Sequence, residues 1–486
     1  MRNIQSMKHE IELTTLKELF QRSADVIFQS YCFQQHNVHF ITCESMFDQF
    51  LLNKVIIDRV QMLFEDASAT PLEEQIVNKL YIPDLQKIIN LDDAITRVFS
   101  GYALLYFEEE KLLFSSKIAK KPNRKPEETK EEQVIKGPRD NFIEDVFVNI
   151  ALIRKRLPTN SLCVKTMEIG KRSKTTVALL YMDDITDKTM LAEINKRLRK
   201  IDTDIVISGD LLMESIEKTA KILPHHDYTG RPDYALQSLS RGRILILIDG
   251  VSYAMITPPN IFLLFKSGED NEYPSFVGSL ERLLRIIGIL ISMLAPGFWL
   301  ALSTYHQEQM PILLLATVVQ SRTGLPFPTL LEILLMLFMF ELFREASLRL
   351  PSLLSGTMSV VGGLIIGDAA IKAGITSPSM IIVIAISSIA AYTLVNQSFV
   401  TAMSIFRLFV ILLSAFFGLF GFFLSMFFIL IYVANIRVLG VPYLNIGANL
   451  NWLDIQKSLM RLAPKGYGKR PEFLQPQDKT RSSNEN

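Results

Sequence analysis

The residues LLRIIGILISMLAPGFWLALST, from Leu283 to Thr304, decide the class of this protein. The stretch holds about 20 mostly apolar residues, enough for an α-helix to cross the roughly 30 Å hydrocarbon core of a bilayer. Arg282 and Arg285 stand at its start, whereas the following loop, Tyr305 to Gln309, carries no Lys or Arg. Because basic residues favour the cytoplasmic side, we expect the preceding residues to be cytoplasmic and this loop to lie outside.

Apolar and charged residues are unevenly distributed along the chain. Of its 486 residues, 49% are hydrophobic and 21% are charged, with the apolar residues concentrated after Leu283 and the charges crowded before it. This asymmetry predicts an α/β soluble N-terminal region followed by a polytopic α-helical membrane domain. The 51 Lys and Arg residues nearly balance the 50 Asp and Glu residues, so the sequence gives no support for a nucleic-acid partner, which usually needs a basic face.

The start of the chain and its cysteines both favour the cytoplasm. Met1 to Arg22 is polar throughout and lacks the apolar run of a secretory signal. The three cysteines, Cys32, Cys43 and Cys163, are odd in number and have no Cys-x-x-Cys spacing. We therefore expect reduced thiols in a cytosolic compartment.

Two mixed α/β subdomains are predicted in the soluble region, residues 1–116 and 137–281, joined by a charged linker, 117–136. The linker includes KKPNRKPEETKEEQ, which has almost no apolar side chain and cannot order itself by burying surface. In the first subdomain, β-branched and aromatic runs predict strands, and apolar residues at helical spacing predict helices. The expected strands are 25–33, 37–42, 100–107 and 111–116, and the expected helices are 44–64 and 90–99.

The second subdomain alternates predicted helices and strands, which is typical of a mixed sheet with helices packed on it. The expected helices are 140–156, 188–199 and 211–222, and the expected strands are 161–169, 175–182, 204–207 and 243–248. Asp249-Gly250 lies between two apolar runs and predicts a hairpin with a type I′ turn.

No motif in the soluble region points clearly to catalysis. A phosphate-binding loop of the form G-x-x-x-x-G-K-[ST] is absent from the sequence. Tyr181-Met182-Asp183-Asp184 copies the aspartate pair of reverse transcriptases, but a strand end followed by a helix start explains it better. His225-His226 beside Asp227 suits a structural or solvated role better than a metal site. We predict that the protein is not an enzyme and needs no cofactor or metal.

Several apolar segments follow the first one, and residues 282–437 are assigned to the membrane domain with about 4–6 membrane segments. Pro311 to Val319 is too short to span and predicts a re-entrant or interfacial segment. Phe406 to Val433 is longer than one span needs, so it is either one tilted helix or a hairpin of two short ones. The basic tail, residues 438–486, is predicted to be cytoplasmic, and a cytoplasmic tail favours the hairpin or partial insertion of this segment. The end of the tail, from about Gln475, is expected to be disordered. The other expected spans are 329–343, 352–373 and 379–395.

Charges cluster at the end of the predicted helix that begins at Thr329. Glu341 and Arg344 are three residues apart, and Glu345 and Arg349 are four apart, so each pair can meet on one helical face. Two interpretations are open: an anchor at the cytoplasmic interface, or charges that face a polar cavity.

The segment from Ser352 to Ala373 carries a row of small residues at intervals of four, widened by Gly362. Such a ridge allows a neighbouring helix to approach closely, and it would equally suit a pore or a moving helix. Asp368 ends the row and is a functional candidate if it lies at membrane depth, or an interfacial residue beside Lys372. The members of the row are Ser355, Ser359, Gly363 and Gly367.

A series of motifs from Gly137 to Leu444 resembles the A subunit of GerA-type spore germinant receptors. It comprises GPRDNFIEDVFVNIALIRKRLP (137–158), GRILILIDG (242–250), LERLLRIIGILISMLAPGFWLAL (280–302), PFP (326–328), ELFREASLRLP (341–351), VGGLIIGDAAIKAGITSP (361–378) and GVPYL (440–444). The resemblance implies a multi-pass protein of the spore inner membrane, without a cofactor, that assembles with a transporter-like B subunit and a C-subunit lipoprotein. Asp368 departs from the family, where an uncharged polar residue is expected.

The resemblance further implies that copies of the chain form an oligomer in membrane lipid that acts as a nutrient-gated ion channel and starts germination. Two alternatives stay open. A secondary transporter would need paired broken helices, and the sequence offers one broken region, Pro311 to Pro328, without a convincing counterpart. A non-conducting assembly scaffold would use the α/β subdomains for partner contacts.

Overall fold

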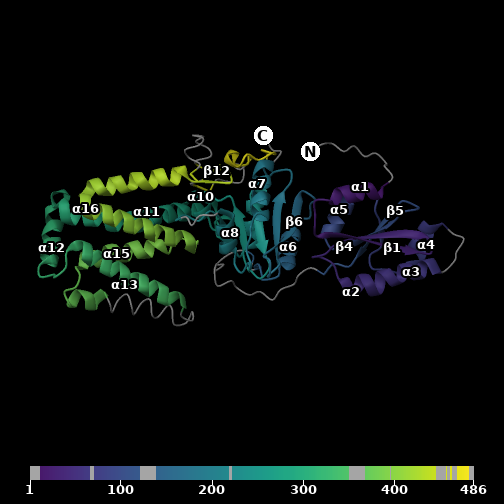
Figure 1. Cartoon of the computed structure of the whole chain (residues 1–486), viewed down its shortest axis with the longest axis horizontal. Coiled ribbons are helices and arrows are strands. Elements are labelled where there is room, and N and C mark those ends of the chain that lie inside the picture. The colour runs from purple at the N-terminus through teal and green to yellow at the C-terminus, as the bar shows by residue number, and fades with distance from the viewer. Residues whose placement is uncertain are drawn as a thin grey trace. The chain divides into compact units, whose positions relative to one another are not determined.

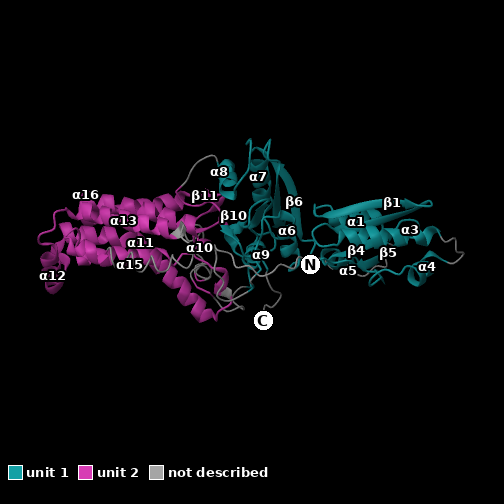
Figure 2. Cartoon of the chain, turned by 90° about the horizontal axis from the view of Figure 1, so that it is seen from below, with its two compact units in different colours: residues 1–219, 228–258, 468–486 teal, residues 220–227, 259–467 magenta. Residues whose placement is uncertain are grey.

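The computed structural model describes residues 11–65, 71–120, 138, 140–217, 222–349, 367–394, 396–444, 456, 460–461 and 468–480. The chain forms two compact units, which Figure 2 colours separately. Unit 1 contains residues 1–219, 228–258 and 468–486, and unit 2 contains residues 220–227 and 259–467. Each unit has its own hydrophobic core.

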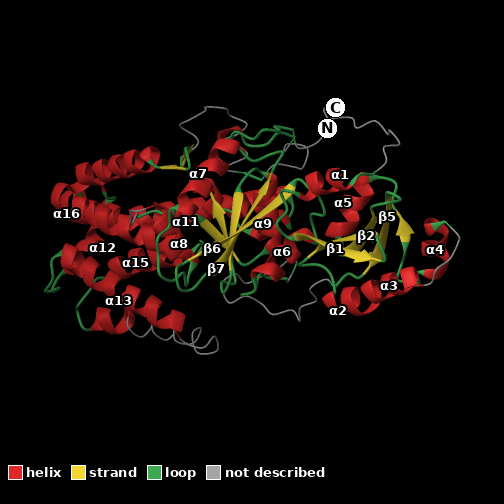
Figure 3. Cartoon of the chain, turned by 45° about the vertical axis from the view of Figure 1, so that its right-hand side comes forward, coloured by secondary structure: helices red, strands yellow, loops and turns green. Residues whose placement is uncertain are grey.

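The first subdomain of unit 1 is an antiparallel sheet between two helical layers (Figures 1 and 3). Its strand order is β1-β2-β4-β5-β3, and all four pairings are antiparallel. The elements are α1 (Leu13–Phe20), β1 (Val26–Phe33), β2 (His36–Cys43), α2 (Gln49–Leu51), a π-helical turn (Leu52–Ile57), α3 (Asp58–Glu65), α4 (Leu72–Lys79), β3 (Gln86–Lys87), α5 (Leu91–Phe99), β4 (Tyr102–Phe107) and β5 (Leu112–Lys117).

Alternation of side chains along β2 explains the two layers. Val38 and Phe40 pack against the π-helical turn, α3 and α4 on one face of the sheet. Ile41 and Cys43 pack against α1 and α5 on the other. The predicted strands and the helix at 90–99 are confirmed, but the helix expected from residue 44 begins at Gln49, because the Asp48 side chain accepts from the first free backbone N–H groups there.

The second subdomain has a sheet of order β6-β7-β9-β10-β8 with helices packed on it. The pairs β6/β7, β7/β9 and β9/β10 are antiparallel, whereas Ser23 makes an isolated parallel bridge to Val164 of β6. The expected mixed sheet stays a prediction, since these pairs do not include β10/β8. The elements are α6 (Val146–Arg154), β6 (Leu162–Ile169), β7 (Thr175–Met182), α7 (Lys188–Arg199), α8 (Gly209–Glu217), β8 (Asp227–Thr229), α9 (Pro232–Ser240), β9 (Ile244–Ile248) and β10 (Ala254–Thr257).

Three local predictions in this subdomain need correction. The helix expected from residue 140 begins at Val146, where Asp145 caps it. The strand expected at 204–207 is a loop, because its backbone is held by the turn between β6 and β7: Arg172 N donates to Asp204 O at 2.9 Å. The hairpin at Asp249-Gly250 exists, but residues 249–253 separate its strands, so the connection is longer than a two-residue type I′ turn.

The described end of the tail, residues 468–480, belongs to unit 1, and its backbone takes part in hydrogen bonds. The disorder expected from Gln475 stays a prediction, since residues 481–486 lie outside the described residues. Gln477 N donates to Ile185 O at 3.0 Å, and Leu474 is buried. Hydrogen bonds from Thr480, ahead of those from Arg470, lower the pKa of Asp478 to about 2. Backbone hydrogen bonds therefore hold this segment, and its polar composition alone does not predict them.

A buried ion pair joins the two subdomains of unit 1. Arg154 at the end of α6 donates from Nε and Nη2 to the two carboxylate oxygens of Asp25, each at 2.9 Å, and both side chains are almost fully buried. The guanidinium also lies 3.9 Å from the ring centroid of Phe99. Burial, followed by the neighbouring Asp25 carboxylate, raises the pKa of Cys43 to about 12.

Unit 2 consists mainly of helices. They are α10 (Ile261–Leu264), a 3₁₀ turn (Gly268–Asn271), α11 (Ser275–Tyr305), a second 3₁₀ turn (Gln307–Gln309), α12 (Ile312–Arg322), α13 (Thr329–Arg349), α15 (Pro378–Ala391) and α16 (Gln397–Asn435), followed by strands β11 (Arg437–Val438) and β12 (Val441–Pro442). In the described part of the chain, α11 and α16 are long and apolar enough to cross a membrane, and α12 and α15 are shorter apolar helices. The apolar stretch that opens the unit thus lies in a helix that begins at Ser275.

Helix α16 reverses direction in its middle (Figure 1). Gly418 has φ 60° and ψ −138°, which interrupts the helical backbone. The ring centroids of Phe406 and Tyr432 lie 5.9 Å apart, although a straight helix rising about 1.5 Å per residue would separate them by roughly 40 Å. Of the two alternatives for this segment, the hairpin is therefore correct.

Close helix approach in the described part of unit 2 occurs at glycines of α11. A Cβ on Gly288 would lie 2.7 Å from Thr393 Oγ1, and a Cβ on Gly297 would lie 2.6 Å from Val410 Cγ1. These positions let α11 pack tightly against α16 and the residues that follow α15.

The junction of unit 1 gives a first prediction. Asp25→Asn leaves the Arg154 guanidinium buried without a counter-charge, so we expect a loss of about 3–5 kcal/mol in the free energy of unfolding. Asp204→Asn is the matched control, since Asp204 pairs with Arg172 in an exposed setting and should cost less than about 1 kcal/mol. Urea unfolding of unit 1 in the full chain, followed by the fluorescence of its aromatic residues, measures both; equal losses would contradict a junction held by this pair.

Candidate functional site

The small-residue row predicted at 352–373 lies mostly outside the described residues: Ser355, Ser359, Gly362 and Gly363 fall there. Gly367 is described, and a Cβ on it would meet Ile381 Cγ2 at an ordinary 3.8 Å, so its described surroundings do not require glycine. The Asp368 side chain is 56% exposed in unit 2 and pairs with Lys372 Nζ at 2.7 Å. Asp368 therefore pairs with Lys372, the residue expected beside it if Asp368 lies at the membrane interface.

A charged network lies among the helices of unit 2. Glu341 and Arg344 on α13 form the predicted ion pair. Arg407 of α16 approaches the same carboxylate, with Nη2 3.7 Å from Glu341 Oε2, and its side chain is only 7% exposed. Glu341 therefore lies between two guanidinium groups that come from different helices.

Hydroxyl groups extend this network to two more helices. The hydroxyls of Ser404 on α16 and Ser387 on α15 each lie 3.4 Å from a nitrogen of Arg407. The Ser387 hydroxyl also donates to the backbone carbonyl of Ser292 on α11 at 2.7 Å. The network thus connects α11, α13, α15 and α16, and Arg407 lies at its centre.

The second predicted pair, Glu345 with Arg349, stays a prediction, because the side chain of Arg349 lies outside the described part of the chain. The structure brings Glu341 and Arg344 together with Arg407, whose place in the network was not predicted. The sequence signal was available: Arg407 is the single charged residue in the long apolar run from Phe406 to Val433.

Glu332 is a second buried charge that the sequence analysis did not single out. It is 1% exposed on α13. Its Oε1 accepts from Thr376 Oγ1 at 2.8 Å, from Ser377 N at 2.6 Å and from Ser377 Oγ at 2.8 Å. A lone acidic residue within the apolar run that begins at Leu330 is the signal that could have found it.

The arginines at the start of the apolar stretch share one carboxylate. Asp270 is 1% exposed; it accepts from Arg282 Nη2 at 3.1 Å through Oδ2 and from Arg285 Nη1 at 2.7 Å through Oδ1. Arg282 Nη1 also donates to the Met460 carbonyl at 3.1 Å, and Ser279 Oγ accepts from Arg461 N at 2.9 Å. The same cluster thus fixes the beginning of α11 and a part of the tail.

The motifs of the soluble region have structural partners. Asp183 forms ion pairs with Arg22 and Lys188, in agreement with the strand-end interpretation. His225 and His226 are buried, so a solvated role for them is wrong. The neighbouring Asp227 accepts from Asn396 Nδ2 at 3.0 Å within unit 2.

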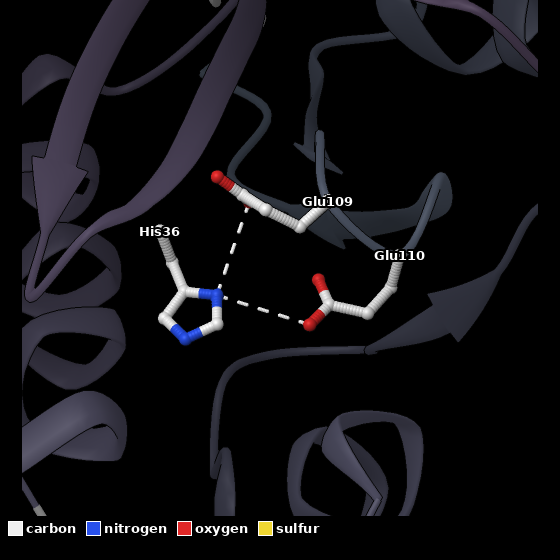
Figure 4. Close-up of side chains that lie close together, drawn as sticks. All are labelled: His36, Glu109 and Glu110. Atoms are coloured by element: carbon white, nitrogen blue, oxygen red, sulfur yellow. Dashed lines mark ion pairs between the residues drawn. The ribbon is translucent and has the colours of Figure 1, made fainter.

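One group of possible metal ligands gathers at two strand turns of the first subdomain (Figure 4). His36 Nδ1 lies 3.9 Å from Glu109 Oε2 and 3.8 Å from Glu110 Oε1. Glu109 Oε1 also accepts from Asn37 N at 2.9 Å, and the His36 ring stacks on Phe64. All three side chains are about one-third exposed. They come from neighbouring turns of the sheet, which accounts for their proximity.

The fold and these buried charges define a class of protein with two parts: an α/β region and a unit of apolar helices that contains a charged network. Comparison with known proteins specifies the class further. A family model described as Bacillus/Clostridium GerA spore germination protein matches residues 14–473. The chain belongs to this family, and the resemblance drawn from its motifs is confirmed.

Individual relatives agree with the family. Spore germination protein XA of Bacillus anthracis is 39% identical over 453 residues, which cover 92% of this chain and 91% of the relative. Spore germination protein KA of Bacillus subtilis (strain 168) is 30% identical over 473 residues, 96% of this chain and 86% of the relative. The relatives support a role in germination, and these two names describe no enzyme.

A solved structure is also similar to part of the chain. It is the crystal structure of the N-terminal domain of the A subunit of the Bacillus megaterium spore germinant receptor GerK3. The match has 22% identity and a TM-score of 0.40, and it covers 53% of this chain and 98% of the other.

The cluster at the start of α11 gives the second prediction. Asp270→Asn removes the shared counter-charge of two largely buried arginines, so we expect unit 2 to lose about 3–5 kcal/mol of stability. Asp368→Asn removes an exposed partner of Lys372 and should cost less than about 1 kcal/mol. Thermal unfolding of the full chain in detergent compares them, and a midpoint for Asp270→Asn as high as that of Asp368→Asn would show that the cluster does not hold α11.

Proposed function

We propose that this chain is a membrane subunit of a nutrient germinant receptor, and that copies of it assemble into a nutrient-gated ion channel in the spore inner membrane. The observation that carries the proposal is the buried network around Arg407. The Arg407 guanidinium joins α13, α15 and α16 and is almost fully buried. Such a charge is costly in a hydrocarbon environment and is kept there mainly where ions or protons move or where helices must be held in register.

The outer surface of α16 supports a membrane location. Its second arm exposes large aromatic side chains at helical spacing, and each is more than half exposed in the isolated chain: Phe420, Phe423 and Phe427. Exposed apolar surface of this extent suits lipid or another subunit. Each arm of the hairpin has roughly 20 residues, about the length of one membrane crossing.

Charge placement supports one orientation of the unit. The reversal at Gly418 returns α16 toward the side on which it began, and Arg282 and Arg285 mark the start of α11. By the positive-inside rule, both the N-terminal region and the tail would then be cytoplasmic. The segment 352–373, with Ser355, Ser359 and Gly363, is the proposed pore lining.

The proposed assembly includes a transporter-like B subunit and a C-subunit lipoprotein. In it, the α/β subdomains of this chain would make subunit contacts rather than perform catalysis. A secondary transporter and a non-conducting scaffold are the competing functions, and ion flux separates them from a channel.

Reconstitution of the purified full chain in liposomes tests the proposal. We expect passive flux of K⁺ down its gradient, and we expect Gly363→Leu to reduce it by at least about tenfold, because a bulky side chain would occlude a pore lined by small residues. Glu308→Gln is the control and should keep the flux within a factor of about two, since this carboxylate is exposed and lies outside the segment 352–373. Absence of flux from stably inserted oligomers would favour the scaffold.

A further inference from the structure

Glu332 sits in apolar surroundings. Its neighbours on α13, Ile333 and Met336, belong to a core cluster that also contains Ala370 and Met380. An ionised carboxylate in such a place is stable only if its charge and both of its oxygens are compensated.

One oxygen of Glu332 is fully compensated. Three donors from Thr376 and Ser377 converge on Oε1, and Ser377 is also the N-cap of the 14-residue helix α15. The N-terminus of a helix carries a partial positive charge of roughly half a unit. The three donors and the helix N-terminus therefore offset part of the negative charge that an ionised carboxylate would carry here.

The other oxygen is not compensated by the protein. Among the described residues, Glu332 Oε2 is buried and has no hydrogen-bond partner. Arg322, at the end of α12, donates to Thr329 Oγ1 and to the Ser303 carbonyl. A buried carboxylate oxygen without a donor points to a ligand that supplies positive charge.

We propose that Glu332 binds a monovalent alkali cation at Oε2, together with the hydroxyl oxygens of Thr376 and Ser377. Each hydroxyl donates its proton to Oε1. Thr376 Oγ1 has two lone pairs and Ser377 Oγ, which also accepts from Met380 N, has one left, and these can coordinate a cation. Carboxylate and hydroxyl oxygens are hard ligands that suit such ions. The site has a single carboxylate, and the helix N-terminus already offsets part of its negative charge. It therefore suits a monovalent cation better than a divalent one.

The bound ion strengthens the link between α13 and α15, the helices that end at Arg349 and begin at Pro378. The inference concerns equilibrium binding and does not rest on ion conduction. The channel proposal can fail while the cation site exists, and the cation site can fail while the chain is a channel. The two proposals are therefore tested separately, by ion flux and by cation-dependent stability.

Thermal unfolding of the full chain in detergent tests the site, with KCl, NaCl or N-methyl-D-glucamine chloride at equal ionic strength. We expect K⁺ or Na⁺ to raise the wild-type midpoint by about 3 °C or more over N-methyl-D-glucamine at saturation. In Glu332→Gln, which keeps the side-chain shape and loses the charge, the midpoint becomes the same in all three salts. Glu308→Gln, which removes an exposed carboxylate of the same unit, keeps the wild-type shift.

A second variant keeps the test decisive if Glu332→Gln does not fold. Thr376→Val removes one coordinating hydroxyl and leaves the carboxylate, so we expect half-saturation at roughly tenfold higher cation concentration, a loss of about 1.4 kcal/mol in binding. An unfolding midpoint of the wild type that is equal in the three salts would overturn the proposal. That result is expected if Glu332 Oε2 holds only a proton or a water molecule. A full cation shift retained by Glu332→Gln would overturn the proposal as well.

Discussion

The backbone at Gly418 combines a φ of 60° with a ψ of −138°, a conformation that residues with a Cβ rarely adopt. Because the chain turns there, one arm of α16 carries Arg407 into contact with α13 and α15, and the other arm returns to pack near Phe406. A Cβ on Gly421 would lie only 2.0 Å from the Leu413 carbonyl oxygen, so the tight turn depends on glycine at a second position too. The core of unit 2 is built across this reversal.

Polar groups in that unit occur where helices must be joined in a particular register. The network around Arg407 connects four helices, Glu332 joins α13 to the start of α15, and Asp270 joins the start of α11 to the preceding turn. In an apolar environment packing alone discriminates weakly between registers, whereas a misplaced buried charge is strongly penalised. The buried ion pair of Arg154 and Asp25 has the same character at the junction inside unit 1.

Local patterns predicted much of this structure, and long-range partners account for most of what they missed. Glu341 and Arg344 were expected to meet because both lie on one turn of helix, and they do. Ile205, Val206 and Ile207 have strand propensity, but their segment is held against the turn after β6 and forms a loop. Spacing in the sequence carries no information that Glu332 binds Ser377, because that contact depends on how α13 and α15 pack.

The reversal of α16 is tested most directly by a distance between its two arms. Spin labels at Thr401 and Ile431, both exposed, can be placed in a full chain whose three cysteines are replaced. A hairpin predicts a short distance, set by the roughly 8–10 Å between packed helix axes plus the arms of the labels. A distance near the roughly 45 Å of a straight helix rising 1.5 Å per residue would contradict it.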